Sequence, residues 1–152
     1  MSKWTIDLSK YAELQKKKIK DIRKSFVFQL YSAIVQKTPV DTGRARANWD
    51  VTIKTPSTSQ TKSTKVKFAN KHQLPKADND ESFFIANNLP YIETLEYGLY
   101  PDPVKRGSWD KNKKMYVKKS QGGFSKQAPN GMVGVTVASA DDYMDIAIRE
   151  NK

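Results

Sequence analysis

A helical pattern gives way to a strand pattern at Thr38-Pro39-Val40-Asp41-Thr42-Gly43-Arg44-Ala45-Arg46-Ala47-Asn48-Trp49. Pro39 has no N–H to donate and disfavours the helical conformation at Thr38, so we expect the preceding helix to end there. Asp41 and Gly43 then supply a turn, because Asp bonds to nearby backbone and Gly accepts a positive φ. From residue 46 polar and apolar side chains alternate, which predicts a half-buried strand over 46–55. Its apolar face would hold Ala47, Trp49, Val51 and Ile53.

One long helix is predicted over 7–38. Its apolar residues recur at spacings of three, four and seven, as on one side of a helix. They are Leu8, Tyr11, Ala12, Ile19, Ile22, Phe26, Leu30 and Ala33. The first half is rich in lysine, whereas residues 25–35 are apolar on nearly all sides, so we expect a sheet or a neighbouring subunit to bury the second half. The core residues expected along the chain are Ile22, Phe26, Leu30, Trp49, Val51 and Val135.

The rest of the chain predicts further short elements. Strands are predicted over 64–69, 82–87 and 131–138. Helices are predicted over 90–97, closed by Gly98, and over 140–150, where Ser139 and Asp142 resemble a capping box. The polar residues 55–64 are expected to form a flexible hairpin loop, and residues 99–129 a long basic loop. Together these elements predict a single-domain α+β fold over 1–152, with the long helix packed on a small, mainly antiparallel sheet.

The chain has 152 residues and a net charge of +11, and the positive charge is concentrated in two segments. Residues 1–38 hold nine Lys or Arg against three acids, and residues 99–129 hold eight against two. Such a surplus suits contact with nucleic acid, with an acidic protein surface, or simply with water. The sequence contains no cysteine, which excludes disulfides, thiolate zinc sites and cysteine nucleophiles.

Targeting signals are not evident in the sequence. No run approaches the roughly 20 apolar residues that a membrane-spanning helix needs. The N-terminus contains Trp4 and Asp7 and no apolar stretch, so it does not resemble a signal peptide. We therefore expect a protein that stays in the cytoplasm where it is made and has no membrane contact.

Catalytic and metal-binding patterns are sparse. His72 is the single histidine and lies in a polar loop, without the further ligands that a metal needs or the partners that a catalytic triad needs. Glu93 and Glu96 lie three apart on one side of the helix predicted over 90–97, a spacing that would allow acid–base work or Mg²⁺ binding. No further acid at motif spacing supports them. We interpret them as surface or interface carboxylates, and expect no enzymatic activity and no cofactor.

The long loop interleaves basic and aromatic side chains. In a nucleic-acid-binding protein the basic groups would neutralise phosphates and the aromatic rings would stack on bases. The same residues would suit a basic loop that inserts into a protein partner. The candidates in either case are Lys105, Arg106, Trp109, Lys113, Lys114, Tyr116, Lys118 and Lys119.

Three blocks of the chain, taken in order, resemble one known family. The first is the long helix that ends in Thr38-Pro39-Val40-Asp41-Thr42-Gly43, followed by Arg44 and Trp49. The others are Asn87-Asn88-Leu89-Pro90-Tyr91-Ile92-Glu93-Thr94-Leu95-Glu96-Tyr97-Gly98 and Gln127-Ala128-Pro129-Asn130-Gly131-Met132-Val133. On these blocks the chain resembles the tail-completion, or head-to-tail joining, proteins of long-tailed bacteriophages, which are also described as neck or minor tail proteins. It departs from that family in the long basic segment between Gly98 and Gln127, which is often shorter there.

The resemblance implies a non-enzymatic α+β subunit that assembles in the host cytoplasm into a ring in the virion neck. Such a ring, hexameric or dodecameric, would lie between connector or stopper proteins and tail-terminator or tube proteins, with genomic DNA passing through its channel. Interface candidates outside the long loop are Arg44, Arg46, Glu93 and Glu96, with Arg46 favoured for a contact between subunits. The alternative function is that of a small basic nucleic-acid-binding protein.

Overall fold

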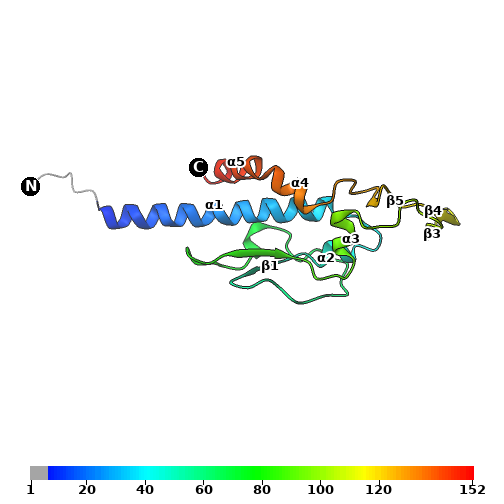
Figure 1. The fold of residues 1–152 in the computed structure, drawn as a ribbon. Coiled ribbons are helices and arrows are strands. Elements are labelled where there is room, and N and C mark those ends of the chain that lie inside the picture. Colours follow the sequence, from blue (N-terminus) through cyan, green and yellow to red (C-terminus); the bar gives the residue numbers. More distant parts are fainter. Residues whose placement is uncertain (1–6) are drawn as a thin grey trace, which may run out of the picture.

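The long helix α1 spans Leu8–Lys37 in the computed structural model, which describes residues 7–152 (Figure 1). The Asp7 carboxylate caps its first turn by accepting the N–H of Lys10 at 3.1 Å. The helix gives way at Thr38 to extended backbone ahead of Pro39, as the sequence predicts. Its 30 residues reach about 45 Å at 1.5 Å per residue. Trp4, used above in the expectation about the N-terminus, lies outside the described residues.

A buried hydroxyl fixes the end of α1. Thr38 Oγ1 donates to the carbonyl of Ile34 at 2.7 Å and accepts the indole N–H of Trp49 at 2.8 Å. Thr38 has no exposed surface and Trp49 is also buried. The hydroxyl therefore gives the Ile34 carbonyl, which also accepts the N–H of Thr38 at 3.0 Å, a second donor, and it gives the buried indole its hydrogen-bond acceptor.

The residues after the turn form a helix before they form a strand. Helix α2 spans Arg44–Ala47 and strand β1 spans Asp50–Ile53, so the strand predicted over 46–55 is confirmed over 50–53 and wrong over 46–49 and 54–55. The cause is Arg46, whose guanidinium donates to the carbonyls of Thr38 and Gln36 at 2.8 and 2.9 Å. A helical turn carries this side chain back to the open end of α1, where unpaired carbonyls need donors.

Strand β1 pairs with β2 (Phe83–Ala86) in an antiparallel ladder that runs from Asp50 opposite Ala86 to Ile53 opposite Phe83. The strand predicted over 82–87 is therefore confirmed. The strand predicted over 64–69 is wrong, because this segment makes no ladder. Phe68 packs instead edge-on against Tyr31 of α1, with ring centroids 5.4 Å apart. The short 3₁₀ helix η1 (Lys71–Gln73) follows this contact.

The polar loop after β1 is held in place by two asparagines rather than hanging free. The amide of Asn48 donates to the carbonyl of Thr61 at 2.9 Å and accepts its N–H at 2.8 Å. The amide of Asn88 donates to the carbonyl of Ser57 at 2.7 Å. These bonds keep residues 57–61 against α2 and the end of β2, which is why the chain does not return beside β1 as a simple hairpin.

Helix α3 spans Ile92–Tyr97 and ends at Gly98, which adopts the predicted left-handed conformation. The long segment that follows contains two small hairpins. One pairs β3 (Ser108–Asp110) with β4 (Met115–Val117), and the other pairs β5 (Ser120–Gln121) with β6 (Phe124–Ser125). Residues 99–129 are therefore more ordered than the single loop predicted from sequence.

The chain ends in two helices, α4 (Val133–Ala138) and α5 (Ala140–Glu150). The strand predicted over 131–138 is wrong, and Val135 lies half-buried on α4. The valine alternation favours a strand locally, but the carboxylate of Glu96 binds three successive N–H groups at the start of α4 and holds a helical turn. The predicted helix over 140–150 is confirmed, although Ser139 makes no capping hydrogen bond.

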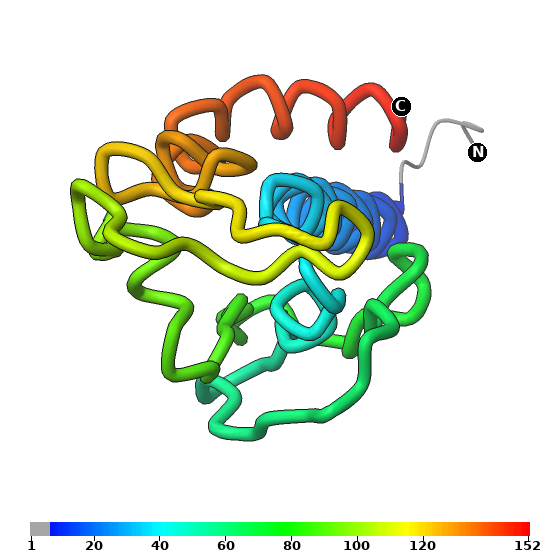
Figure 2. Tube along the Cα trace, turned by 90° about the vertical axis from the view of Figure 1, so that its right-hand side faces the viewer, coloured from blue at the N-terminus to red at the C-terminus, as the bar shows by residue number. Residues whose placement is uncertain are grey.

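The elements form an α+β fold with α1 in the middle. In Figure 2, α1 is seen nearly end-on, with α5 on one side and the segment containing α2, β1 and β2 on the other. The core lies where α1 meets the segment that contains α2, β1 and β2. Its buried side chains include Val27, Tyr31, Ile34, Val35, Trp49 and Val51. Ile22, Phe26 and Leu30 keep part of their surface exposed. The core therefore lies under the second half of α1.

Thr38→Val should destabilise the fold by about 1–3 kcal/mol, because it keeps the volume but leaves the buried indole N–H of Trp49 unpaired. Urea unfolding of Thr38→Val, Trp49→Phe and the double variant should give a double-variant loss smaller than the sum of the single losses. Thr58→Val, at an exposed position, is the control. Additive losses would contradict the proposed role of this hydrogen bond.

Candidate partner-binding surface

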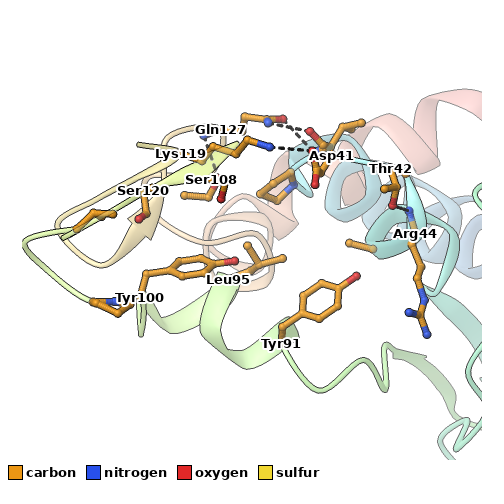
Figure 3. Close-up of a pocket in the computed structure, with 18 residues that line it drawn as sticks. Asp41, Thr42, Arg44, Tyr91, Leu95, Tyr100, Ser108, Lys119, Ser120 and Gln127 are labelled. Atoms are coloured by element: carbon orange, nitrogen blue, oxygen red, sulfur yellow. Dashed lines mark hydrogen bonds and ion pairs between the residues drawn. The ribbon is translucent and has the colours of Figure 1, made fainter. Parts of the chain in front are cut away.

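The turn that follows α1 is clamped by the segment before α4. The Gln127 amide accepts the N–H of Val40 at 2.8 Å and donates to its carbonyl at 2.9 Å, as a neighbouring strand would. Lys119 Nζ lies 2.9 Å from the Asp41 carboxylate (Figure 3). Asn87 donates to the carbonyl of Ala45 at 2.9 Å. The three blocks that carry the family resemblance therefore meet at one place in the fold.

An open cleft of about 600 Å³ lies beside this turn. The turn forms one wall, Tyr91 and Leu95 lie on the helix side, and Tyr100 faces them from the next segment (Figure 3). Burial raises the pKa of the Tyr100 phenol, and the neighbouring Tyr91 adds to the shift. Lys119 also lines the cleft. This combination of aromatic and aliphatic surface with a nearby cation suits an apolar side chain of a protein partner.

The β3–β4 hairpin presents aromatic rings and positive charge together. The rings of Trp109 and Tyr116 meet edge-on with centroids 5.3 Å apart. The Arg106 guanidinium lies 4.8 Å from the Tyr116 ring centroid and donates to its hydroxyl at 3.0 Å. Trp109, Met115 and Tyr116 nevertheless remain about half exposed. The hairpin is therefore an internally braced surface that leaves apolar atoms in water.

The turn of this hairpin is held by one carboxylate. Asp110 accepts the backbone N–H groups of Lys113 and Asn112 at 3.1 and 2.9 Å. These bonds favour the ionised form and lower the pKa of Asp110. Lys113 and Lys114 are consequently fixed at the tip, where their side chains are exposed.

The structure separates the predicted basic and aromatic site residues into three groups. The β3–β4 hairpin and its flanks carry Lys105, Arg106, Trp109, Lys113, Lys114, Tyr116 and Lys118. Lys119 lies apart from them, paired with Asp41 at the cleft. Arg44 donates to the carbonyl of Thr61 at 3.4 Å, and Arg46 is bound to the end of α1. The two arginines thus have contacts within the chain that the sequence did not indicate.

Glu93 and Glu96 do not act as a pair. Glu93 is exposed, whereas Glu96 Oε2 accepts the N–H groups of Met132 and Val133 at 2.7 and 2.9 Å. Its other oxygen accepts the N–H of Gly134 at 2.8 Å. One carboxylate therefore anchors the start of α4, while the other remains available to solvent or a partner.

Sequence reasoning missed the residues that hold the surface together. Asn48, Asn87, Asn88 and Gln127 each bond to backbone far along the chain. An amide side chain carries a donor and an acceptor, so it can pair with a peptide group as a strand would. The only signal in the sequence is their position, within or at the edge of the three blocks.

No protein-family model, curated protein or solved structure matches the chain. Within residues 7–152 no group of three or more acidic or histidine side chains is placed to hold a metal ion. In the same part of the chain, every helix is too short or too polar to cross a membrane.

Glu96→Gln should lower the free energy of unfolding by about 1–3 kcal/mol, because the amide NH₂ would replace an acceptor that faces backbone donors. Glu93→Gln is the matched control, since it makes the same change three residues earlier at an exposed site, and should change stability by less than about 0.5 kcal/mol. Chemical denaturation measures both. Equal effects of the two substitutions would contradict the assignment of Glu96 as the anchor of α4.

Proposed function

We propose that this protein is a structural subunit of a bacteriophage neck, which joins the tail to the head by forming a ring between connector and tail-tube proteins. The ring would be hexameric or dodecameric, with the genomic DNA passing through its channel, and would assemble in the host cytoplasm without enzymatic activity. The family resemblance of the three blocks supports this proposal. In the structure these three blocks meet around the end of α1, where their contacts hold the turn at 39–43.

The observation that carries the proposal is the position of the exposed apolar residues. Two groups of them lie at opposite ends of the elongated molecule, while others, such as Val137 on α4 and Ile148 on α5, lie between these ends (Figure 1). The first part of α1 carries Leu8, Tyr11, Leu14 and Ile19, and the β3–β4 hairpin carries Trp109, Met115 and Tyr116. Exposed apolar side chains that are grouped in this way are typical of surfaces that contact other proteins. Two such ends fit a subunit that contacts one neighbour at each end.

The charge of the hairpin favours a protein surface over the channel. A strongly cationic lumen would retard a moving polyanion, whereas an acidic face on a connector or tube would attract the hairpin and speed docking. The lysines at the hairpin tip, held by the turn at Asp110, would then set the register of the contact. We therefore propose that the hairpin docks on an acidic face of an adjacent neck protein.

Nucleic-acid binding is the second candidate, because Trp109 and Tyr116 lie exposed among lysines as a stacking site requires. Titration of duplex and single-stranded DNA at several salt concentrations separates the two functions. Tight binding at physiological salt that weakens when Trp109 is replaced by Ala would favour this candidate over joining. Weak binding that vanishes with added salt would reflect net charge alone.

Deletion of the gene from the phage or prophage that encodes it should yield filled heads and separate tails, and the purified protein should join them in vitro. A shortened variant, in which Asn-Gly replaces residues 109–116, should fold with unchanged stability but fail to join. A two-residue turn can close the Ser108 and Val117 pair, so the rest of the fold is retained. Electron microscopy and infectivity measure the outcome. Normal tailed particles without the gene would refute the function.

A further inference from the structure

The first part of α1 projects beyond the end of α5 (Figure 1), and near its inner end Lys20 Nζ lies 3.4 Å from the Asp78 carboxylate. Every residue from Leu8 to Ile19 is exposed. Leu8, Tyr11 and Ile19 expose 73%, 58% and 61% of their surface. We call residues 8–22 of α1 the stalk. An amphipathic helix of this kind is stable in water mainly when another element covers its apolar side.

The uncovered side of the stalk continues the side of α1 on which α5 lies. Along α1, α5 is bound at Ser25, Gln29 and Lys37, through Asn151, Glu150 and Tyr143 respectively. Counting back from Ser25 by threes and fours, the same side of the helix passes through Ile22, Lys18, Gln15, Tyr11 and Leu8. Among residues 7–152, therefore, α5 covers one half of this helix face, and no described element covers the other half.

The bare half has the length that a second α5 needs. The stalk spans 15 residues, or about 22 Å, and α5 has 11 residues, or about 16 Å, at 1.5 Å per residue. A second α5 would fit on the stalk end to end with the first. A second α5 must come from another chain, because the protein's own α5 is already seated farther along α1.

The charges on the stalk favour the α5 of a neighbouring subunit, rather than its stalk, as the element that covers this surface. The stalk holds Lys10, Lys16, Lys17 and Lys18 against Glu13 and Asp21, and its fifth lysine, Lys20, pairs with Asp78. The remaining positive surplus means that two stalks would repel one another. The outward side of α5 carries Asp141 and Asp145 in one row with Ile148, at spacings of four and three. All three are exposed, and Asp142 lies beside them. Acid and apolar surface on α5 thus complement base and apolar surface on the stalk, with Arg149 the one opposing charge.

We propose that the outward side of α5 in one subunit docks on the stalk of the next subunit. Because the two surfaces are different patches of the same chain, the contact is heterologous and repeats around a closed ring. Lys16 and Lys18 flank the apolar stripe of the stalk and would face Asp141 and Asp145. This inference rests on the self-assembly in the proposed function, and it names the two surfaces that meet.

Charge exchange tests the contact directly. Lys16→Glu with Lys18→Glu, and separately Asp141→Lys with Asp145→Lys, should each raise the apparent dissociation constant of self-association about tenfold or more, as measured by sedimentation velocity. An equimolar mixture of the two variants should recover assembly, because each stalk then meets an α5 of opposite charge. The control is Lys62→Glu with Lys65→Glu at exposed positions of the polar loop, which makes the same charge change elsewhere and should associate as the unmodified chain does.

Cysteine cross-linking gives a second measurement, because the chain has no cysteine of its own. A variant with Ile19→Cys and Ile148→Cys should form a ladder of covalent oligomers on oxidation. The control pair, Ile19→Cys with Val66→Cys, uses an exposed position in the polar loop and should not. Efficient dimers from Ile19→Cys alone would overturn the proposal by showing stalk against stalk.

Two further results would overturn the proposed contact. One is unchanged association of both charge-reversed variants, and the other is a chain that stays monomeric at every concentration. Neither result decides the joining function, which the gene-deletion and in vitro joining assay tests independently. If the purified protein fails to join heads to tails but its stalk still cross-links to α5, the contact between subunits stands and the proposed neck function is refuted.

Discussion

The hydrogen bonds of the Thr38 hydroxyl tie the end of the long helix to the strand that follows it. Trp49 needs an acceptor for its buried N–H, and the Thr38 hydroxyl supplies it while donating to the carbonyl of Ile34 at the helix end. Because α1 ends there, the turn at 39–43 begins at a fixed place. Arg46 binds the carbonyls of Gln36 and Thr38 just before the turn, and Gln127 binds Val40 within it. The position of the turn also fixes one wall of the cleft. It places Asp41 within reach of Lys119, which follows the β3–β4 hairpin, so this ion pair depends on the turn being held.

The elements predictable from the sequence are those whose signals are local. Pro39 marks the end of α1, Gly98 closes α3, and the α+β class follows from the mixture of patterns. The failures share a physical cause, which is bonding between distant residues. Valine alternation at 133–137 favours a strand, but Glu96, far back in the chain, stabilises a helix there. Arg46 likewise favours a helical turn by binding α1, and Phe68 enters the core against Tyr31 instead of joining a ladder.

The candidate surface was predictable in composition but not in shape. The basic and aromatic residues of 105–118 were named from sequence, and the structure gathers them on and beside one hairpin. Lys119 could not be separated from them by sequence, because its partner Asp41 lies far away. The amides of Asn87 and Gln127 carry no sequence signal of their own role. A firmly held centre with apolar surface at both ends would favour the proposed assembly, because each neighbour would meet a surface that is already formed before contact.

The central claim is that the stalk of α1 is covered only when subunits assemble. Hydrogen–deuterium exchange at several protein concentrations measures this directly. Residues 8–19 should exchange quickly in dilute protein and become protected as oligomers form, while residues 25–37, already covered by α5 and the core, should be protected throughout. Oligomers whose stalk amides exchange as fast as those of the dilute protein would contradict the account.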